Sequence, residues 1–168
     1  DYDEDGCADA DAEDGDDDND GHPDVGVDAV DPTDDDKCPK GVKGSDGFNA
    51  TNPSEDYDSD GCKDDSAEDT DDDNDGVNDG SDGCNPGIIG WSSGSITDHD
   101  GDGCLDATED DDDDDDGIVD ARDTCPRGLT NWLSNSKTDV DGDGCNDQIE
   151  DLDCCTENTD SSSPDTTE

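Results

Sequence analysis

The sequence predicts a mostly irregular, loop-rich chain: a disulfide-stapled tandem repeat rod with little helix or strand and no conventional hydrophobic core. Three observations predict this fold class. Only 17 of the 168 residues are Val, Ile, Leu or Phe, the formal net charge is −51, and an acidic motif ending in cysteine recurs along the chain. So little apolar content with so much charge normally signals disorder. The regular spacing of glycines and of nine cysteines argues instead for a structure that something other than apolar packing stabilises.

The charge restricts the partners that this chain can have. It carries 58 acidic residues against 7 lysines and arginines, and carboxylates about 4 Å apart in water repel by about 1 kcal/mol per pair. Nucleic acids and anionic membranes are excluded as ligands because their recognition needs basic patches. No stretch reaches the length of an apolar membrane span. Cations are therefore the ligands that we expect.

Four stretches that end in Asp-Gly-Cys mark the repeats. They are "DYDEDGC", "DYDSDGC", "DHDGDGC" and "DVDGDGC", and in the first three repeats a second acidic stretch such as "DDDNDGVND" and a cysteine close to proline follow. Self-similarity at a period of about 41 residues indicates an array. We divide the chain into residues 1–55, a first repeat with an insertion; 56–97, the second repeat; 98–138, the third repeat; 139–155, a half repeat; and 156–168, a flexible Ser/Thr-rich tail.

The first acidic stretch of each repeat fits a calcium-binding loop. Calcium takes six to eight oxygen ligands, which one known loop supplies from positions 1, 3, 5, 7, 9 and 12, with glycine at position 6. In the third repeat Asp98 takes position 1, Gly103 position 6 and Glu109 position 12, whereas Glu13 and Glu68 fall at position 13 of theirs. The candidate ligands of this loop type are Asp1, Asp3, Asp5 and Asp9; Asp56, Asp58, Asp60, Asp64 and Glu68; Asp98, Asp100, Asp102, Asp106 and Glu109; and Asp139, Asp141, Asp143, Asp147 and Glu150.

The second acidic stretch follows the same pattern. In the first repeat either Asp28 or Asp31 would complete the ligand set, and residues that join the two loops, such as Glu68, Asp69 and Asp110, would bridge two ions. The candidate ligands of this loop type are Asp16, Asp18, Asp20 and Asp24; Asp71, Asp73, Asp75, Asp79 and Asp82; and Asp112, Asp114, Asp116, Asp120 and Asp123. Seven loops in all predict calcium as the cofactor, with at least seven ions.

Other sites and activities fit the sequence less well. A single D-x-D-x-D-G arises by chance in acidic sequence, but seven copies in phase with Gly and Cys do not. No amphipathic helix flanks the loops, as an EF-hand would require, and the "GGxGxD" of β-roll repeats is absent. There is no C-x-x-C zinc motif, and His22 and His99 each stand alone. No nucleophile, triad or apolar pocket is indicated, so we predict no catalytic residue and no enzyme.

The paired loops resemble the thrombospondin type 3 repeat family. The resemblance rests on "DTDDDNDGVNDGSDGCNP" and "DDDDDDGIVDARDTCP" and extends over residues 1 to about 150. It implies acidic loops that wrap calcium ions with little regular secondary structure. The chain departs from the family pattern in that the loop cysteine directly follows glycine, as at Cys62 and Cys104, and in the Gly-Trp-Ser or Asn-Trp-Leu of its connectors.

Cysteine spacing predicts three disulfides. Each cysteine near proline precedes a loop cysteine by 24, 20 or 20 residues, which pairs Cys38 with Cys62, Cys84 with Cys104 and Cys125 with Cys145. Each closed loop would contribute roughly 3 kcal/mol in the chain-entropy model. Phe48, Trp91 and Trp132 lie inside these loops, where we expect each to pack on its disulfide rather than to form an exposed ligand platform.

Three cysteines are left over. Cys7 is placed like the acceptor of a repeat junction, so Cys154 or Cys155 of a neighbouring chain would pair with it head to tail. Pairing of Cys7 within a longer precursor, or a local bond between Cys154 and Cys155, is the alternative.

The functional hypothesis is an extracellular or cell-surface structural protein, a calcium-stiffened rod that assembles head to tail into a filament or surface fibre. Cysteine-rich composition favours the oxidising extracellular setting, and we expect that any leader has been removed. The alternative is a calcium-dependent spacer or adhesion module of a larger cell-surface protein, and a third hypothesis is a disordered acidic calcium buffer. Asn49 begins an N-glycosylation sequon, and glycans are also possible on the Ser/Thr tail.

Overall fold

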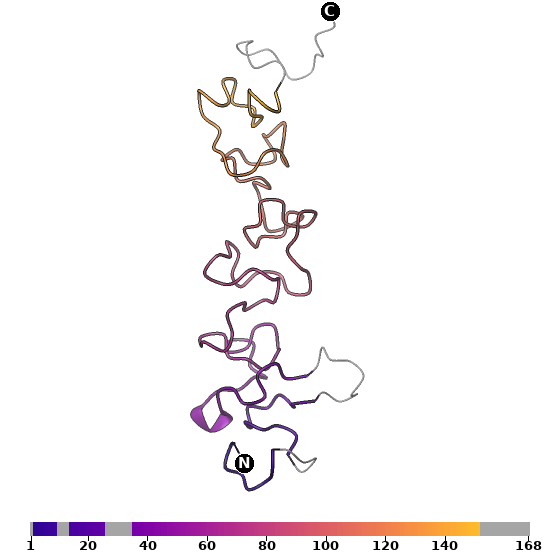
Figure 1. The fold of residues 1–168 in the computed structure, drawn as a ribbon, viewed down its shortest axis with the longest axis vertical. Helices are drawn as coiled ribbons and strands as arrows, with labels where there is room; N and C mark the ends of the chain where they lie inside the picture. Colours follow the sequence, from indigo (N-terminus) through magenta and orange to yellow (C-terminus); the bar gives the residue numbers. More distant parts are fainter. Residues whose placement is uncertain (1, 10–13, 26–34, 152–168) are drawn as a thin grey trace, which may run out of the picture. The chain divides into compact units, whose positions relative to one another are not determined.

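The computed structural model describes residues 2–9, 14–25 and 35–151, and there the chain is almost entirely irregular. The element order contains one 3-10 helix, η1, over Gly44–Asp46. Neither an α-helix nor a strand occurs in the described ranges (Figure 1). The predicted loop-rich fold class is therefore confirmed. Within the same ranges the model has no helix of the length and apolar character that a membrane span requires.

Several predicted residues fall outside the described ranges. They are Asp1, Glu13, Asp28, Asp31, Cys154 and Cys155, together with the Ser/Thr-rich tail.

The chain forms two compact units, Asp1–Ser92 and Ser93–Glu168. The first unit holds the loops of the first and second repeats and is closed by the Cys38–Cys62 disulfide, with a Cα–Cα distance of 5.2 Å. The second holds the loops of the third repeat and the half repeat and contains the Cys125–Cys145 disulfide, at 5.3 Å. Cys84 and Cys104 are disulfide-bonded as well. All six cysteines that the spacing assigned to disulfides are thus in disulfides.

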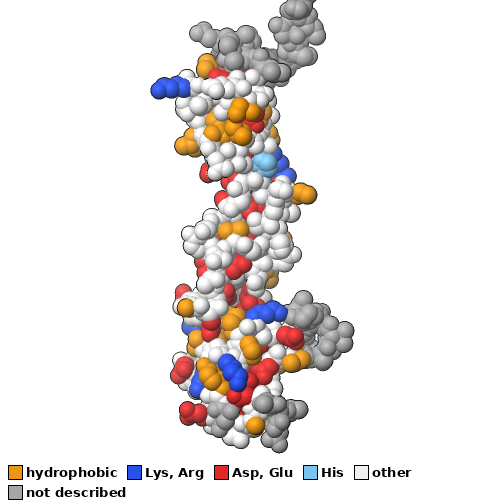
Figure 2. Space-filling model, viewed as in Figure 1, with side chains coloured by type: hydrophobic (Ala, Val, Ile, Leu, Met, Phe, Trp, Pro, Cys, Tyr) orange, Lys and Arg blue, Asp and Glu red, His pale blue; other side chains and the backbone are white. Residues whose placement is uncertain are grey.

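Aspartates occupy the interior where a globular domain has apolar side chains. The buried apolar residues of the described ranges are Phe48, Ala50, Cys62, Cys104 and Cys145. Fourteen aspartates are also buried, among them Asp18, Asp56, Asp114 and Asp116 at 0% exposure. On the face in Figure 2, red side chains are scattered among white atoms, and hydrophobic side chains form separate small groups. No conventional hydrophobic core is present in the described residues.

The acidic loops share one backbone signature, a left-handed conformation at positions 4 and 6. Position 6 is glycine in every loop, which tolerates positive φ without the steric cost of a Cβ. Position 4 is filled by residues that adopt this region most readily, mainly Gly, Asn and Asp. The position-4 residues are Glu4, Asn19, Ser59, Asn74, Gly101, Asp115 and Gly142, and the position-6 residues are Gly6, Gly21, Gly61, Gly76, Gly103, Gly117 and Gly144. The seven predicted loops therefore have one backbone design.

In the first and third repeats, the connector after the cysteine near proline returns to the second loop of its own repeat. Ala50 N–H donates to the Asp20 carbonyl at 3.1 Å, and Ser134 N–H donates to the Asp116 carbonyl at 2.8 Å. Phe48, two residues before Ala50, is 4% exposed, whereas Trp132, two residues before Ser134, is half-buried. These two connectors are thus tied to the second loop two residues after Phe48 and Trp132.

Candidate metal sites

Backbone N–H groups fix the carboxylates of each loop. In the loop that begins at Asp98, the Oδ2 atom of Asp98 accepts from Gly103 N–H at 3.2 Å. Asp102 accepts from Cys104 N–H at 2.8 Å, and Asp106 accepts from His99 N–H at 3.0 Å. The backbone N–H groups of positions 6, 7 and 2 thereby orient the carboxylates of positions 1, 5 and 9, respectively. Because an ionised carboxylate has about four acceptor sites, each keeps capacity for a further partner.

These three hydrogen bonds recur in the other loops. The loops that begin at Asp56, Asp139, Asp16, Asp71 and Asp112 have the same bonds from position 6 to position 1, from 7 to 5 and from 2 to 9. In the first loop the corresponding bonds reach Asp5 and Asp9. The structure therefore places the sequence-predicted residues of positions 1, 5 and 9 in equivalent local environments.

Carboxylate oxygens converge inside these loops. Asp16, Asp18 and Asp20 offer oxygens that all lie within 4.8 Å of one another, as do Asp56, Asp58 and Asp60. In the second loop type, some of the oxygens are buried without a hydrogen-bond partner: Oδ2 of Asp20, Asp75 and Asp116 at position 5, and Oδ1 of Asp71 and Asp112 at position 1. A buried polar atom without a partner costs about 1–3 kcal/mol, and more when it is charged. A bound cation would remove that cost.

The pKa values of these acids reflect the crowding. Burial is the first cause in each case, and neighbouring aspartates add to it. Together they raise the pKa of Asp20 to about 7, of Asp58 to about 8 and of Asp100 to about 7. Burial likewise raises the pKa of Asp75 and Asp116 to about 6. A nearby divalent cation favours the charged form and would oppose these shifts.

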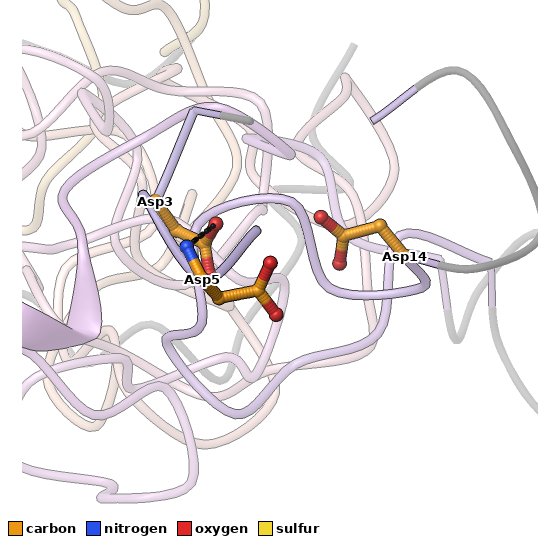
Figure 3. Close-up of side chains that lie close together, drawn as sticks. All are labelled: Asp3, Asp5 and Asp14. Carbon is orange, nitrogen blue, oxygen red and sulfur yellow. Dashed lines mark hydrogen bonds between the residues drawn. The ribbon is translucent and has the colours of Figure 1, made fainter. Parts of the chain in front are cut away.

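An acid from the bridge between the two loops completes the first loop type. The carboxylate of Asp14 points toward those of Asp3 and Asp5 from a separate stretch of chain, and oxygens of the three lie within 4.8 Å (Figure 3). Asp69 and Asp110 hold the equivalent position, and Oδ2 of all three bridge acids is buried without a hydrogen-bond partner. The sequence indicated Asp69 and Asp110 as joining residues and missed Asp14.

Two of the three predicted glutamates, Glu68 and Glu150, accept hydrogen bonds from the backbone. Glu68 Oε1 accepts from Lys63 N–H at 3.0 Å and from Val42 N–H at 3.3 Å, and Glu150 Oε2 accepts from Asn146 N–H at 3.2 Å. A methyl group at Gly41 would lie 2.8 Å from Glu68 Oε2. One oxygen of Glu68 therefore organises the backbone, and the other faces the turn that follows Cys38.

Asp36 is a site residue that sequence reasoning missed. Asp36, Asp82 and Asp123 each accept a hydrogen bond from the N–H of the cysteine two residues later, at 2.6 to 2.7 Å. Oδ2 of Asp36 and of Asp123 is buried without a hydrogen-bond partner, and burial raises the pKa of Asp36 to about 7 and of Asp123 to about 6. Asp36 thus holds in the first repeat the place for which Asp28 or Asp31 was proposed. The D-x-C spacing shared with Asp82 and Asp123 is the signal that identifies it.

A glycine three residues after each cysteine near proline links the two loop types. Gly41, Gly87 and Gly128 donate their N–H groups to the position-3 aspartate of the second loop, Asp18, Asp73 and Asp114, at 2.5 to 2.8 Å. Their carbonyl groups are contacted by position 2 of the first loop: Tyr2 Oη at 3.1 Å, Tyr57 Oη at 2.9 Å and His99 Nε2 at 2.9 Å. In the half repeat, position 2 is Val140. The sequence signal was an aromatic or imidazole side chain between the first two aspartates.

Comparison with protein-family models, with curated proteins and with solved structures found no match for this chain.

Proposed function

We propose that this chain is an extracellular calcium-binding structural protein. One observation carries the proposal: equivalent loops each bury a carboxylate oxygen without a hydrogen-bond partner, at Asp20, Asp75 and Asp116. In the first of these loops, oxygens of Asp16, Asp18 and Asp20 lie within 4.8 Å of one another. Burying several charges of one sign is unfavourable unless they are paired or bind a metal. A chain that repeats this arrangement gains stability when a cation is bound in each loop.

The ligand chemistry favours calcium. The converging atoms are carboxylate oxygens, which suit hard cations, and the position-1, 3 and 5 spacing is that of a calcium loop. Calcium accepts six to eight oxygens in flexible geometry, whereas magnesium keeps several waters and demands a regular octahedron. We propose at least seven ions, one for each loop, with Asp14 and Asp36 added to the predicted ligands and Asp69 and Asp110 kept as bridging acids. The resemblance to thrombospondin type 3 repeats supports the same assignment.

Calcium would supply the folding free energy that apolar packing does not. Metal binding to a site that exists only in the folded chain stabilises the fold. The disulfides then hold consecutive repeats together, and they are compatible with the extracellular location that we propose.

Circular dichroism and small-angle X-ray scattering during a calcium titration test this function. We expect the metal-free chain to be expanded and to become compact over a calcium range that the same concentration of magnesium does not reproduce. A chain that is equally compact in excess chelator would contradict the proposal.

The finer proposal is head-to-tail assembly into a filament. Within each unit the end of one repeat is joined to the first loop of the next by a disulfide and by a backbone hydrogen bond, Lys37 N–H to Asp60 O at 2.8 Å and Thr124 N–H to Asp143 O at 2.7 Å. A junction that is repeated inside one chain is a contact that two chains could also form. Cys7 with Cys154 or Cys155 of another copy is the proposed covalent link, although both C-terminal cysteines lie outside the described residues.

Negative-stain electron microscopy in millimolar calcium, with a matched sample in chelator, distinguishes the assemblies. Fibres that loosen on chelation would support the filament. Separate short particles in calcium would overturn it and favour the spacer or adhesion module.

Asn49 remains a proposed glycosylation site. Its side chain is exposed, and its Oδ1 atom accepts from the Thr51 hydroxyl at 2.8 Å. Mass spectrometry of the natural protein, before and after treatment with an amide-cleaving glycosidase, tests this proposal.

A further inference from the structure

A second kind of acidic cluster lies where the two loops of a repeat meet. It joins position 9 of the first loop, the bridge acid, and position 2 of the second loop. The three clusters are Asp9, Asp14 and Asp17 in the first repeat, Asp64, Asp69 and Asp72 in the second, and Asp106, Asp110 and Asp113 in the third. In the first two clusters, oxygens of the three residues lie within 4.8 Å of one another. We call these the junction clusters.

A basic side chain forms ion pairs with two acids of the junction cluster in the first and third repeats. Lys40 Nζ lies 2.6 Å from Asp9 Oδ2 and 3.3 Å from Asp17 Oδ2. In the third repeat, Arg127 Nη2 lies 2.5 Å from Asp106 Oδ2, and its Nε atom lies 2.8 Å from Asp113 Oδ2. Lys40 and Arg127 lie at the same position of different repeats. Each of the two clusters is therefore paired with a basic side chain of its own repeat.

The second repeat has proline at that place. Lys40, Pro86 and Arg127 each directly precede the glycine that donates its N–H to the second loop. The same hydrogen bond from the glycine N–H fixes the backbone of the three turns. Pro86 therefore occupies the position from which Lys40 and Arg127 reach the junction cluster in the other repeats. Among the described residues, no Lys or Arg side chain forms an ion pair with Asp64, Asp69 or Asp72.

The second junction cluster also contains a buried carboxylate oxygen that has no hydrogen-bond partner. Asp69 is 7% exposed, and its Oδ1 atom accepts from Asp71 N–H at 3.0 Å. Its Oδ2 atom is buried without a hydrogen-bond partner, as is Oδ1 of Asp72. Three like charges this close repel by several kcal/mol at the effective dielectric of a protein surface. In the first and third junction clusters, an ammonium or guanidinium group reduces this repulsion.

We propose that the junction cluster of Asp64, Asp69 and Asp72 binds a divalent cation in the position that Lys40 and Arg127 fill in the neighbouring repeats. Its all-carboxylate ligands suit calcium, with water completing the shell. This ion is additional to the seven loop ions. The proposal rests on the calcium chemistry of the proposed function and shares Asp64 and Asp69 with the first loop. Asp72 belongs to neither loop's ligand set, so a variant of Asp72 tests the junction site separately from the loop sites.

Native mass spectrometry at saturating calcium tests the site because it counts bound ions as integers. Asp72→Asn should bind one calcium ion fewer than the wild type, whereas Asp65→Asn, which removes an exposed acid nearby, should match the wild type. Arg127→Gln should bind one ion more because it opens the third junction cluster, and Lys137→Gln is the control for loss of a basic residue.

Each outcome decides a separate point. Equal counts for Asp72→Asn and Asp65→Asn, with the loops still filled, would overturn the junction site alone. A wild-type protein that binds no calcium would overturn both this site and the proposed function. If Asp72→Asn loses several ions by unfolding, Arg127→Gln decides: a gain of one ion over Lys137→Gln supports the site, and no gain overturns it.

Discussion

At the scale of single residues, the acid two positions before the cysteine near proline was missed in the first repeat only. Asp36 follows an insertion, so counting from the loop start leads to Asp28 or Asp31 instead. Its hydrogen bond from Cys38 N–H and its buried Oδ2 atom identify it.

We expect Asp36→Asn to raise the calcium concentration at the midpoint of folding. The amide keeps the size of the side chain and can still accept from Cys38 N–H, but it loses the charge that a cation requires. A tenfold weaker site corresponds to about 1.4 kcal/mol. Asp46→Asn, at an exposed residue of η1, is the control. A calcium titration followed by circular dichroism measures both, and identical midpoints would remove Asp36 from the ligand set.

Gly144 is a residue at which a single methyl group should be poorly tolerated. Its φ is 89°, and a Cβ there would overlap the Asp123 carboxylate. The left-handed backbone alone costs an L-residue roughly 1–2 kcal/mol. We therefore expect Gly144→Ala to lower the free energy of unfolding in calcium by about 2 kcal/mol or more. Gly94→Ala, where nothing lies within 4 Å of a Cβ, should be near neutral by urea denaturation. Equal effects of the two would contradict the docking of Asp123 against this loop.

At the scale of the element, one turn in each complete repeat forms hydrogen bonds with both acidic loops, through the N–H and the carbonyl group of its glycine. Gly87 donates its N–H to Asp73 and receives the hydroxyl of Tyr57 on its carbonyl. Tyr57→Phe removes only that hydroxyl, so the free energy of unfolding should fall by about 1 kcal/mol. Thr70→Val removes a hydroxyl from an exposed side chain and should change little. If both variants unfold alike in urea at fixed calcium, the tyrosine does not join the two loops.

The same element shows which features local sequence can predict. The loops and their cysteine spacing were predictable because D-x-D-x-D-G fixes hydrogen bonds within about nine residues, as in the loop of Asp98. The contacts of Asp14, Asp36 and Gly41 depend on how separate loops meet, and no local period encodes that. Glu68 was assigned by counting along the loop, whereas the fold also uses its carboxylate to hold Val42 N–H, 26 residues away.

At the scale of the whole molecule, protons and calcium should compete for the same carboxylates. Burial raises the pKa of Asp20 and Asp36 to about 7, and of Asp58 to about 8, from an ordinary value of 3.8. Between these limits the metal-free folded chain binds more protons than the unfolded chain. Stability then falls as pH rises, because its slope with pH follows the protons bound by the unfolded state minus those bound by the folded state.

The pH dependence of stability should have opposite signs without and with calcium. Without metal, protonation should therefore preserve more folded structure at pH 5 than at pH 8, where the chain should be expanded. The general repulsion from a net charge of −51 acts in the same direction. With calcium, binding requires the ionised carboxylates and releases protons, so the calcium-loaded protein should be more stable at pH 8 than at pH 5. Circular dichroism and thermal unfolding at the two pH values, with chelator and with excess calcium, compare the folded content and stability of the four states, and a state without a transition counts as unfolded. A metal-free protein that is more stable at pH 8 would show that these carboxylates are not buried together without the ion, and equal calcium-dependent gains at both pH values would show that they are not its ligands.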